Sequence, residues 1–220
     1  MPLEIDHLII CCDRGAPEGK ALIAHGLLEG SSNVHAGQGS ANRRFFFENA
    51  YLELLWIDDP AAAKREPARR TRLWERWRRR DASACPFGIA FRPLDPAAET
   101  LPPFPTWAYH APYLPAQVSI GIALATPLSE PEFLYLPFAT RPDAKGREPI
   151  AHPAGLRQLT GVRIGLPPST MRSQAAQAVA GLGLLAWFDA PAYVMELTFG
   201  EGAAGRSIDF RPVLPLLVHR

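Results

Sequence analysis

Residues 4–10 have the sequence Glu-Ile-Asp-His-Leu-Ile-Ile, residues 35–42 have His-Ala-Gly-Gln-Gly-Ser-Ala-Asn, and residues 50–56 have Ala-Tyr-Leu-Glu-Leu-Leu-Trp. The two outer stretches are apolar and rich in β-branched or aromatic residues, which is typical of strands. Each of them carries one potential metal ligand, His7 in the first and Glu53 in the second. With a glycine-rich polar loop between them, they predict a site for a small molecule.

Alternation along the two predicted strands decides which side chains can meet, because successive residues point to opposite faces. One face of the first strand carries Ile5, His7, Ile9 and Cys11, and one face of the later strand carries Tyr51, Glu53 and Leu55. If these faces line one concavity, His7 and Glu53 converge. A carboxylate within Leu-Glu-Leu-Leu must face water or a partner, since burying it alone is costly. For His7, a hydrogen bond to Asp6 or to the backbone is the alternative to a role in the site.

The polar loop at 35–42 has chemistry of its own. Gly37 and Gly39 allow positive φ angles and a close approach of the backbone to a ligand, and consecutive N–H groups there can hold an anion or a carbonyl oxygen. Asn42 offers both a donor and an acceptor, and His35 can act as a general base near neutral pH. A tight polar turn stabilised by its own side chains is the alternative interpretation.

The order strand, helix, strand, strand, strand is predicted for the first 60 residues and recurs later in weaker form. The second copy has a proline-rich segment where the helix would be, and the third has a helix that Ser169 is expected to cap. The first two predicted units are 1–60 and 85–140. A basic helical segment at 61–84 joins them, and together they form one domain over 1–140. A linker at 141–155 leads to a third unit at 156–220, which is expected to pack on the first two.

Composition favours a globular protein with a real core. Hydrophobic residues make up 47% of the 220 residues, and 23 prolines favour many short strands over a helical bundle. The net charge of +1 gives no general attraction to nucleic acid or to a membrane. Three cysteines, two of them adjacent, predict no disulfide framework, and no apolar run approaches the roughly 20 residues that span a bilayer. A cytoplasmic location is therefore expected.

These motifs resemble the vicinal oxygen chelate superfamily and, more narrowly, its glyoxalase-like branch. The resemblance is carried by residues 6–10, by the loop at 35–42 and by residues 51–54, with further matches at Leu-Pro-Phe (136–138) and His-Pro-Ala-Gly (152–155). It implies an α+β fold in which repeated βαβββ modules form a cupped, barrel-like mixed sheet around a small-molecule ligand. It also implies a homodimer, because members of the superfamily often complete the cup by pairing; whether the cup closes within one chain or between two is left open.

The resemblance also implies roles for particular residues. In the superfamily's metalloenzymes the matching positions bind a divalent ion, so His7 and Glu53 are the expected ligands of Fe, Mn, Ni, Co or Zn, with His35 as a third candidate and His110 as a more distant one. A complete set would take further ligands from the second unit, whose expected strands at 86–91 and 132–137 carry no central His or Glu. Catalytic roles fall on His35 and Glu53. Contacts to the substrate are expected from Gly37, Gly39, Ser40, Asn42 and Tyr51.

Two functions follow from the resemblance. The first is a glyoxalase-like enzyme, namely a lyase, an isomerase or a ring-cleaving oxygenase, which acts on a small oxygen-bearing metabolite. The second is a metal-free binder of small molecules, like the antibiotic-sequestering members of the superfamily. Its cup would be apolar and aromatic, lined by residues such as Tyr51, Phe45 or Phe47, Trp107 and Tyr135.

The arginine-rich stretch at 64–80 has two interpretations. Its arginines, with Trp74 and Trp77, could contact phosphates and stack on bases. A solvated amphipathic helix with Leu73, Trp74 and Trp77 packed inward suits a nearly neutral chain better. The expected partner is therefore a small molecule, and neither nucleic acid nor a membrane.

Overall fold

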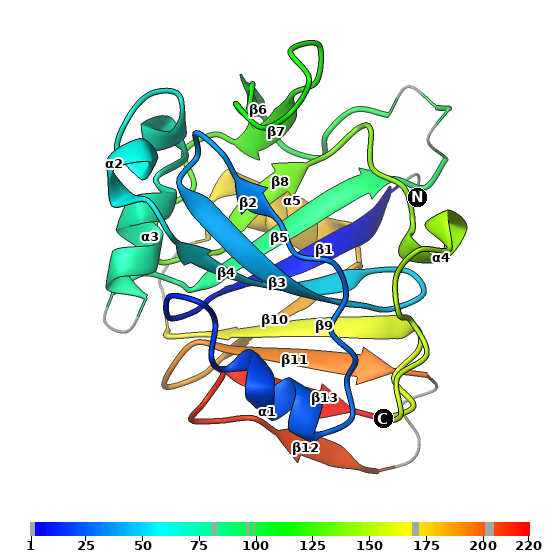
Figure 1. Cartoon of the computed structure of the whole chain (residues 1–220). Helices are drawn as coiled ribbons and strands as arrows, with labels where there is room; N and C mark the ends of the chain where they lie inside the picture. The colour runs from blue at the N-terminus through cyan, green and yellow to red at the C-terminus, as the bar shows by residue number, and fades with distance from the viewer. Residues whose placement is uncertain (1–2, 81–82, 96, 99, 169–171, 201–204) are drawn as a thin grey trace.

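The computed structural model describes residues 3–80, 83–95, 97–98, 100–168, 172–200 and 205–220. Two β-sheets with few helices make up the fold (Figure 1). The first half of the chain contains β1 (Leu3–Cys11), α1 (Gly19–Ala24), β2 (Val34–His35), β3 (Ser40–Phe46), β4 (Tyr51–Ile57), α2 (Pro60–Ala63), a 3₁₀ turn (Ala68–Thr71), α3 (Leu73–Arg79), β5 (Phe87–Pro93), β6 (Thr106–Tyr109), β7 (Ile120–Ala123) and β8 (Glu132–Tyr135). The rest contains α4 (Pro142–Lys145), β9 (Leu159–Leu166), α5 (Gln174–Gly181), β10 (Ala186–Asp189), β11 (Val194–Phe199), β12 (Ser207–Asp209) and β13 (Leu216–His219).

The larger sheet has eight strands in the order β2-β3-β4-β1-β5-β8-β7-β6. Strands β1 and β4 are parallel, β5 and β8 are parallel, and the antiparallel pair β1–β5 joins the two halves. The first half follows the predicted βαβββ order, and the second repeats its strand pairing, with no helix among the described residues between β5 and β6. The α+β fold with a cupped mixed sheet is thereby confirmed, and both halves of this sheet come from one chain.

The elements of the C-terminal unit follow the expected order of strand, helix and strands, with one strand more than βαβββ, but the strands pair differently from those of the first unit. The strand order of this sheet is β10-β9-β11-β13-β12, in which β9 is parallel to β10 and antiparallel to β11. The difference follows from α5. The chain passes through this helix after β9 and returns as β10, which pairs with β9 in parallel orientation. In the first unit, the parallel neighbour of β1 is β4. The predicted capping residue Ser169 lies outside the described residues; α5 is capped by Ser173, whose Oγ accepts a hydrogen bond from Ala176 N at 3.2 Å.

One apolar core joins the two sheets. Alternate residues of β1, β4 and β5 pack with side chains of β9, β11 and β13 in a single buried cluster, which includes Leu8, Leu52, Phe87, Ile164 and Leu197. The opposite face of the large sheet lines the cup, so its central strands are buried on both faces. No helix among the described residues is both long enough and apolar enough to cross a membrane.

A β-bulge in β1 changes one predicted side-chain direction. The pairing register of β1 with β5 shifts between Ile5 and His7. Ile5 therefore joins the core between the sheets, whereas strict alternation places it on the cup face with His7. His7, Ile9 and Cys11 keep the predicted direction and line the cup.

His152, in the segment after β8, forms hydrogen bonds with two backbone groups of the first unit. Its Nδ1 accepts a hydrogen bond from the backbone N–H of Leu28 at 2.9 Å, so the ring proton is on Nε2, which donates to the carbonyl of Phe46 at 2.8 Å. Burial lowers the pKa of His152, although the hydrogen bond to Phe46 acts in the opposite direction. The neutral ring thus satisfies two backbone groups, one in the loop after α1 and one at the end of β3.

We expect His152→Ala to lower the free energy of unfolding by about 1–3 kcal/mol, because both backbone groups lose their partner. Acid should act on the same contact. The folded pKa of His152 lies below the ordinary histidine value of about 6.5, so the unfolded chain binds more protons. This stabilisation is present above that value and is lost as the pH falls below it. Urea unfolding at pH 7.5 and 5.5 measures both effects, with exposed His110→Ala as the control. Acid sensitivity as large in His152→Ala as in the wild type would contradict the assignment.

Candidate functional site

The cup contains a cavity of about 240 Å³ within one chain. Both halves of the eight-stranded sheet and the segment containing α3 contribute to its wall, which is mostly apolar. The apolar and aromatic lining residues are Ile9, Cys11, Tyr51, Leu55, Leu73, Phe87, Tyr109, Tyr113, Leu114, Ile120, Ile122, Leu134, Leu136 and Phe138. The polar ones are His7, Asn33, His35, Gln38, Asn42, Arg44, Glu53, Thr71, Arg76 and Glu132.

His7 is oriented by a buried carboxylate. Its Nδ1 lies 2.6 Å from Asp6 Oδ1, and Asp6 Oδ2 accepts a hydrogen bond from Arg92 at 2.9 Å. Burial alone raises the pKa of Asp6, but the hydrogen bond from His7 and the charge of Arg92 outweigh it, so the pKa is lowered. Asp6 is therefore a carboxylate, and His7 Nδ1 must donate to it. This fixes the ring with Nε2 toward the cavity.

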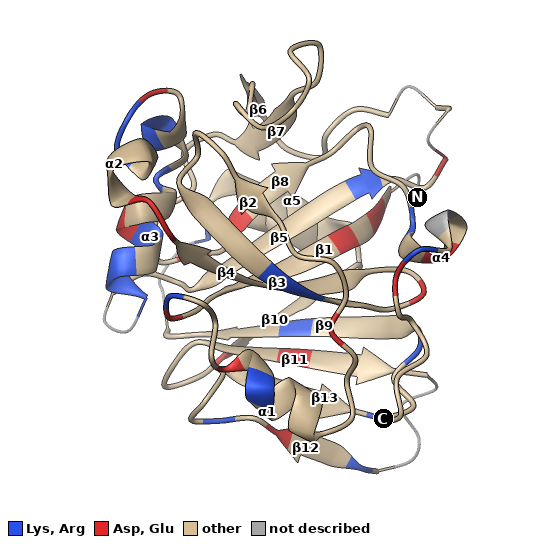
Figure 2. Ribbon diagram, viewed as in Figure 1, with Lys and Arg blue, Asp and Glu red and all other residues tan. Residues whose placement is uncertain are grey.

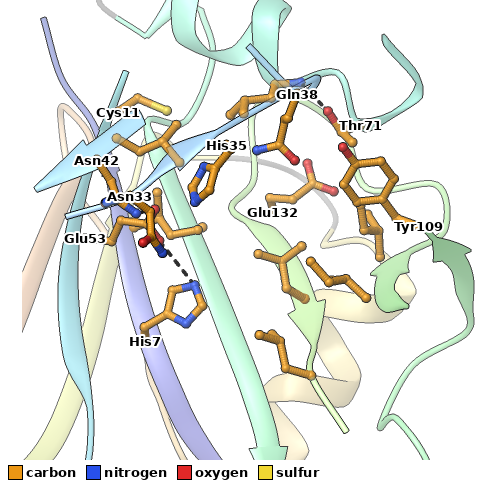
Figure 3. Close-up of a pocket in the computed structure, with 18 of the residues that line it drawn as sticks. His7, Cys11, Asn33, His35, Gln38, Asn42, Glu53, Thr71, Tyr109 and Glu132 are labelled. Atoms are coloured by element: carbon orange, nitrogen blue, oxygen red, sulfur yellow. Dashed lines mark hydrogen bonds and ion pairs between the residues drawn. The ribbon is translucent and has the colours of Figure 1, made fainter. Parts of the chain in front are cut away.

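Glu53 meets His7 at the cavity wall, as the alternation of β1 and β4 predicts. Its Oε2 lies 3.4 Å from His7 Nε2, and its Oε1 accepts a hydrogen bond from Asn42 Nδ2 at 2.6 Å. Asn42 is fixed in turn, because its Oδ1 accepts from the backbone N–H of Asn33 at 2.7 Å. Tyr51 stacks on the His7 ring with centroids 4.5 Å apart. Figure 3 shows His7, Asn33, Asn42 and Glu53 gathered on one side of the cavity.

His35 approaches the same cavity from β2. Its Nδ1 lies 2.8 Å from Ser40 Oγ, which also accepts from Gln38 Nε2 at 2.8 Å, and its ring stacks on Tyr113. Burial lowers the pKa of His35, and the nearby Glu53 charge only partly offsets this. His35 is therefore neutral near pH 7, which is the state that a general base requires.

Three predicted substrate contacts lie behind the cavity wall. Ser40 supports His35, as described above. Gly37 and Gly39 have positive φ angles of 78° and 77°, and a Cβ would press Gly37 against Pro112 and Gly39 against the Asp59 carbonyl. The two glycines thus shape the loop that carries His35, and Asn42 and Tyr51 are the predicted contacts that line the cavity.

The donor set does not complete a metal site made by the protein alone. Among the described residues, no three His, Cys, Asp or Glu side chains are grouped closely enough to hold an ion. His7 and Glu53 provide two donors, and the His35 ring is held away by Ser40. His110 is exposed and lies outside the cavity lining. A metal here would need its remaining ligands from water or substrate.

The aromatic lining differs from the predicted one. Phe45, Phe47 and Tyr135 belong to the core between the sheets, and Trp107 is not among the lining residues. Tyr51 lines the cavity as predicted, and Tyr109, Tyr113 and Phe138 line it in place of the others. The sequence pattern predicted the strands but did not show which of the two faces of each strand lines the cup.

Two charged residues of the far wall escaped the sequence analysis. Glu132 is the first residue of β8, so the search of the expected strand at 132–137 for a central His or Glu passed over it. It alternates with Leu134 and Leu136 on the cavity face. Arg76 lies on α3 within the basic stretch, which Figure 2 shows at one edge of the sheet. Leu73 and Trp77 pack inward as predicted, but Arg76 does so as well and is only 2% exposed.

Comparison with known proteins agrees with this architecture. A family model described as "Glyoxalase-like domain" matches residues 5–182. A solved structure described as a hypothetical protein from Staphylococcus aureus aligns over 99% of each chain with a TM-score of 0.50 at 11% identity, which bears on the fold alone. No curated protein matches the sequence.

Proposed function

Because the chain belongs to the glyoxalase-like domain family, we propose that it binds a small oxygen-bearing metabolite in the cup and acts on it through Glu53 and His35. One observation carries the proposal: the buried pair of His7 and Glu53 faces a mostly apolar cavity within one chain. Apolar walls with a few convergent polar groups are typical of ligand sites. The volume of about 240 Å³ is below the roughly 300–1,000 Å³ of sites for drug-sized ligands, which favours a small metabolite.

The polar side of the cavity suits proton transfer. Glu53 is buried, its Oε1 accepts a hydrogen bond from Asn42 and its Oε2 lies 3.4 Å from His7 Nε2, and neutral His35 presents a second base nearby. Two such groups can remove a proton from a carbon beside an oxygen and return one elsewhere, which is the chemistry of a lyase or an isomerase. A cup that only sequesters its ligand is the alternative, and the hydrogen bond that Asn42 already donates to Glu53 favours it.

A divalent metal is a second proposal, favoured by the contact between Asp6 and His7. Metal-bound histidines commonly donate their other ring N–H to a carboxylate, as His7 does to Asp6. His7 Nε2 and Glu53 Oε2 would be the ligands from the protein. Such an ion would polarise vicinal oxygens of the substrate, and a ring-cleaving oxygenase would need it. Titration with Ni, Mn, Fe, Co or Zn, followed by calorimetry in wild type and His7→Ala, tests this; identical heats in both proteins would refute the site.

Binding is tested by thermal shift against small compounds that carry two adjacent oxygens, such as catechol and short 1,2-diols, since a ligand of the folded state raises Tm. Incubation of each binding compound with the protein, followed by mass spectrometry, then separates enzyme from binder. Product formed only with active protein supports the enzyme, and unchanged compound supports the sequestering alternative. If none of these compounds raises Tm, the proposal that the cup binds vicinal oxygens fails.

For any compound that is turned over, we expect Glu53→Gln to lower kcat by about 10²–10⁴-fold, the usual contribution of a positioned base. Glutamine keeps an oxygen for the Asn42 amide, so the fold should survive. Glu66→Gln is the matched control, because Glu66 is exposed and forms an ion pair with Arg69 on the surface. Unchanged kcat in Glu53→Gln would remove Glu53 from the chemistry.

A further inference from the structure

The far side of the cavity holds a buried hydroxyl that lacks a partner. Tyr109, at the end of β6, is 1% exposed and lines the cavity, yet its hydroxyl makes no hydrogen bond among the described residues. A buried polar group without a partner costs stability. Figure 3 shows the Tyr109 hydroxyl directed toward Glu132, across the cavity from His7. An unsatisfied group aimed into a cavity indicates a ligand atom that completes it.

Glu132 supplies an acceptor to the same cavity and is rigidly held. Its Oε2 lies 3.2 Å from Arg76 Nη2. Arg76 Nη1 donates to the carbonyls of Cys85 at 2.7 Å and Glu130 at 2.6 Å, which fixes the guanidinium. Among the described residues only Arg76 hydrogen-bonds the Glu132 carboxyl group, so Oε1 is left to the cavity.

The charges of this pair decide what the far side can bind. Arg76 and Glu132 together are close to neutral, so neither an anion nor an ammonium group gains from binding there. Burial raises the pKa of Glu132, although Arg76 opposes it, and burial raises the pKa of Tyr109 to about 12. Tyr109 thus keeps its proton and can donate, while Glu132 Oε1 can accept. A ligand hydroxyl, which is both donor and acceptor, matches the two.

Apolar side chains line the same cavity. Ile9, Leu55, Ile122 and Leu134 are among them, and Figure 3 shows Tyr109 and Glu132 on the side of the cavity opposite to His7. We propose that Tyr109 and Glu132 form a second subsite, which binds a hydroxyl group at the end of the ligand remote from His7 and Glu53. The substrate class is then an elongated molecule with adjacent oxygens at one end, an apolar or aromatic body and a hydroxyl at the other. The assignment of the first end rests on the proposed function.

The test uses two probes that differ only in the remote hydroxyl, 4-phenylbutane-1,2-diol and 4-(4-hydroxyphenyl)butane-1,2-diol. Calorimetry measures both in wild type, Tyr109→Phe and Tyr193→Phe, the last of which removes a hydroxyl away from the cavity. We expect the phenol to bind wild type roughly 3- to 10-fold more tightly, as one net hydrogen bond allows. Tyr109→Phe should abolish the preference without lowering the Tm of the free protein, and Tyr193→Phe should keep it.

The outcomes separate this inference from the proposed function. If both diols bind equally and Tyr109→Phe changes neither, the subsite is refuted while the site for vicinal oxygens stands. If neither diol binds, the site for vicinal oxygens fails. The second subsite is then tested alone by comparing the binding of 4-propylphenol with that of propylbenzene, which lacks the hydroxyl. If the wild type prefers 4-propylphenol and Tyr109→Phe loses that preference, the subsite is supported. If the wild type shows no such preference, the subsite is overturned. Glu132→Gln, which preserves the shape of the side chain, should likewise reduce the preference for the phenol.

Discussion

Replacing Arg76 by alanine is expected to lower the free energy of unfolding by about 3–5 kcal/mol, the usual cost of breaking a buried ion pair from one side. Arg76 is 2% exposed and binds Glu132 together with the carbonyls of Cys85 and Glu130. The variant leaves the Glu132 carboxylate inside the cup without its counter-charge. It also strips partners from carbonyls on the segments that flank β5 and β8, so the far wall of the cavity should loosen with the loss of stability.

Urea unfolding of Arg76→Ala beside Arg69→Ala measures this effect. Arg69 is exposed and makes one ion pair with Glu66, three residues away, so its loss should cost no more than about 0.5 kcal/mol. Both variants remove one positive charge from the same basic stretch, and burial is the main difference between them. If the two variants unfolded at the same urea concentration, Arg76 would have to be a surface residue.

Gly39→Ala is expected to cost about 2–5 kcal/mol and to displace the loop that carries His35. The φ angle of Gly39 is +77°, which disfavours any residue with a Cβ by about 1–2 kcal/mol. The added Cβ would also lie 2.2 Å from the Asp59 carbonyl oxygen and 2.7 Å from Ala63 N, both of which are backbone atoms at α2. Since neither atom can rotate away, the loop or α2 must shift, and overpacking of this kind adds about 1–3 kcal/mol.

Gly155→Ala isolates the conformational part of this cost. Gly155 has a φ angle of +74°, and a Cβ there would meet no atom within 4 Å. It should therefore cost only about 1–2 kcal/mol and leave ligand binding unchanged, whereas Gly39→Ala should weaken binding through His35. Equal losses of stability in the two variants, with equal binding, would show that Gly39 has no special contact with α2.

The side of the site that the sequence predicted is the side built on long, regular strands. Alternation in β1 and β4 placed His7 and Glu53 on one wall of the cup, because the period of two is a property of the strand itself and needs no knowledge of its neighbours. The roles of Gly37 and Gly39 were harder to assign. A positive φ was predictable from glycine, but the contacts with Pro112 and with the Asp59 carbonyl depend on chain segments that are remote or fold back.

The sequence by itself determined the α+β class, the cupped sheet, the family and one polar side of the cavity, because local patterns and motifs encode all of these. Tertiary structure alone decided the inward direction of Arg76, the exposure of Glu132 and Tyr109 to the cavity, and the parallel pairing of β9 with β10. Each of these depends on which distant segment lies opposite a residue. The segment that lies opposite a residue changes with a β-bulge, with the length of a short strand or with a small rotation of a helix. The local sequence pattern is almost the same in each case.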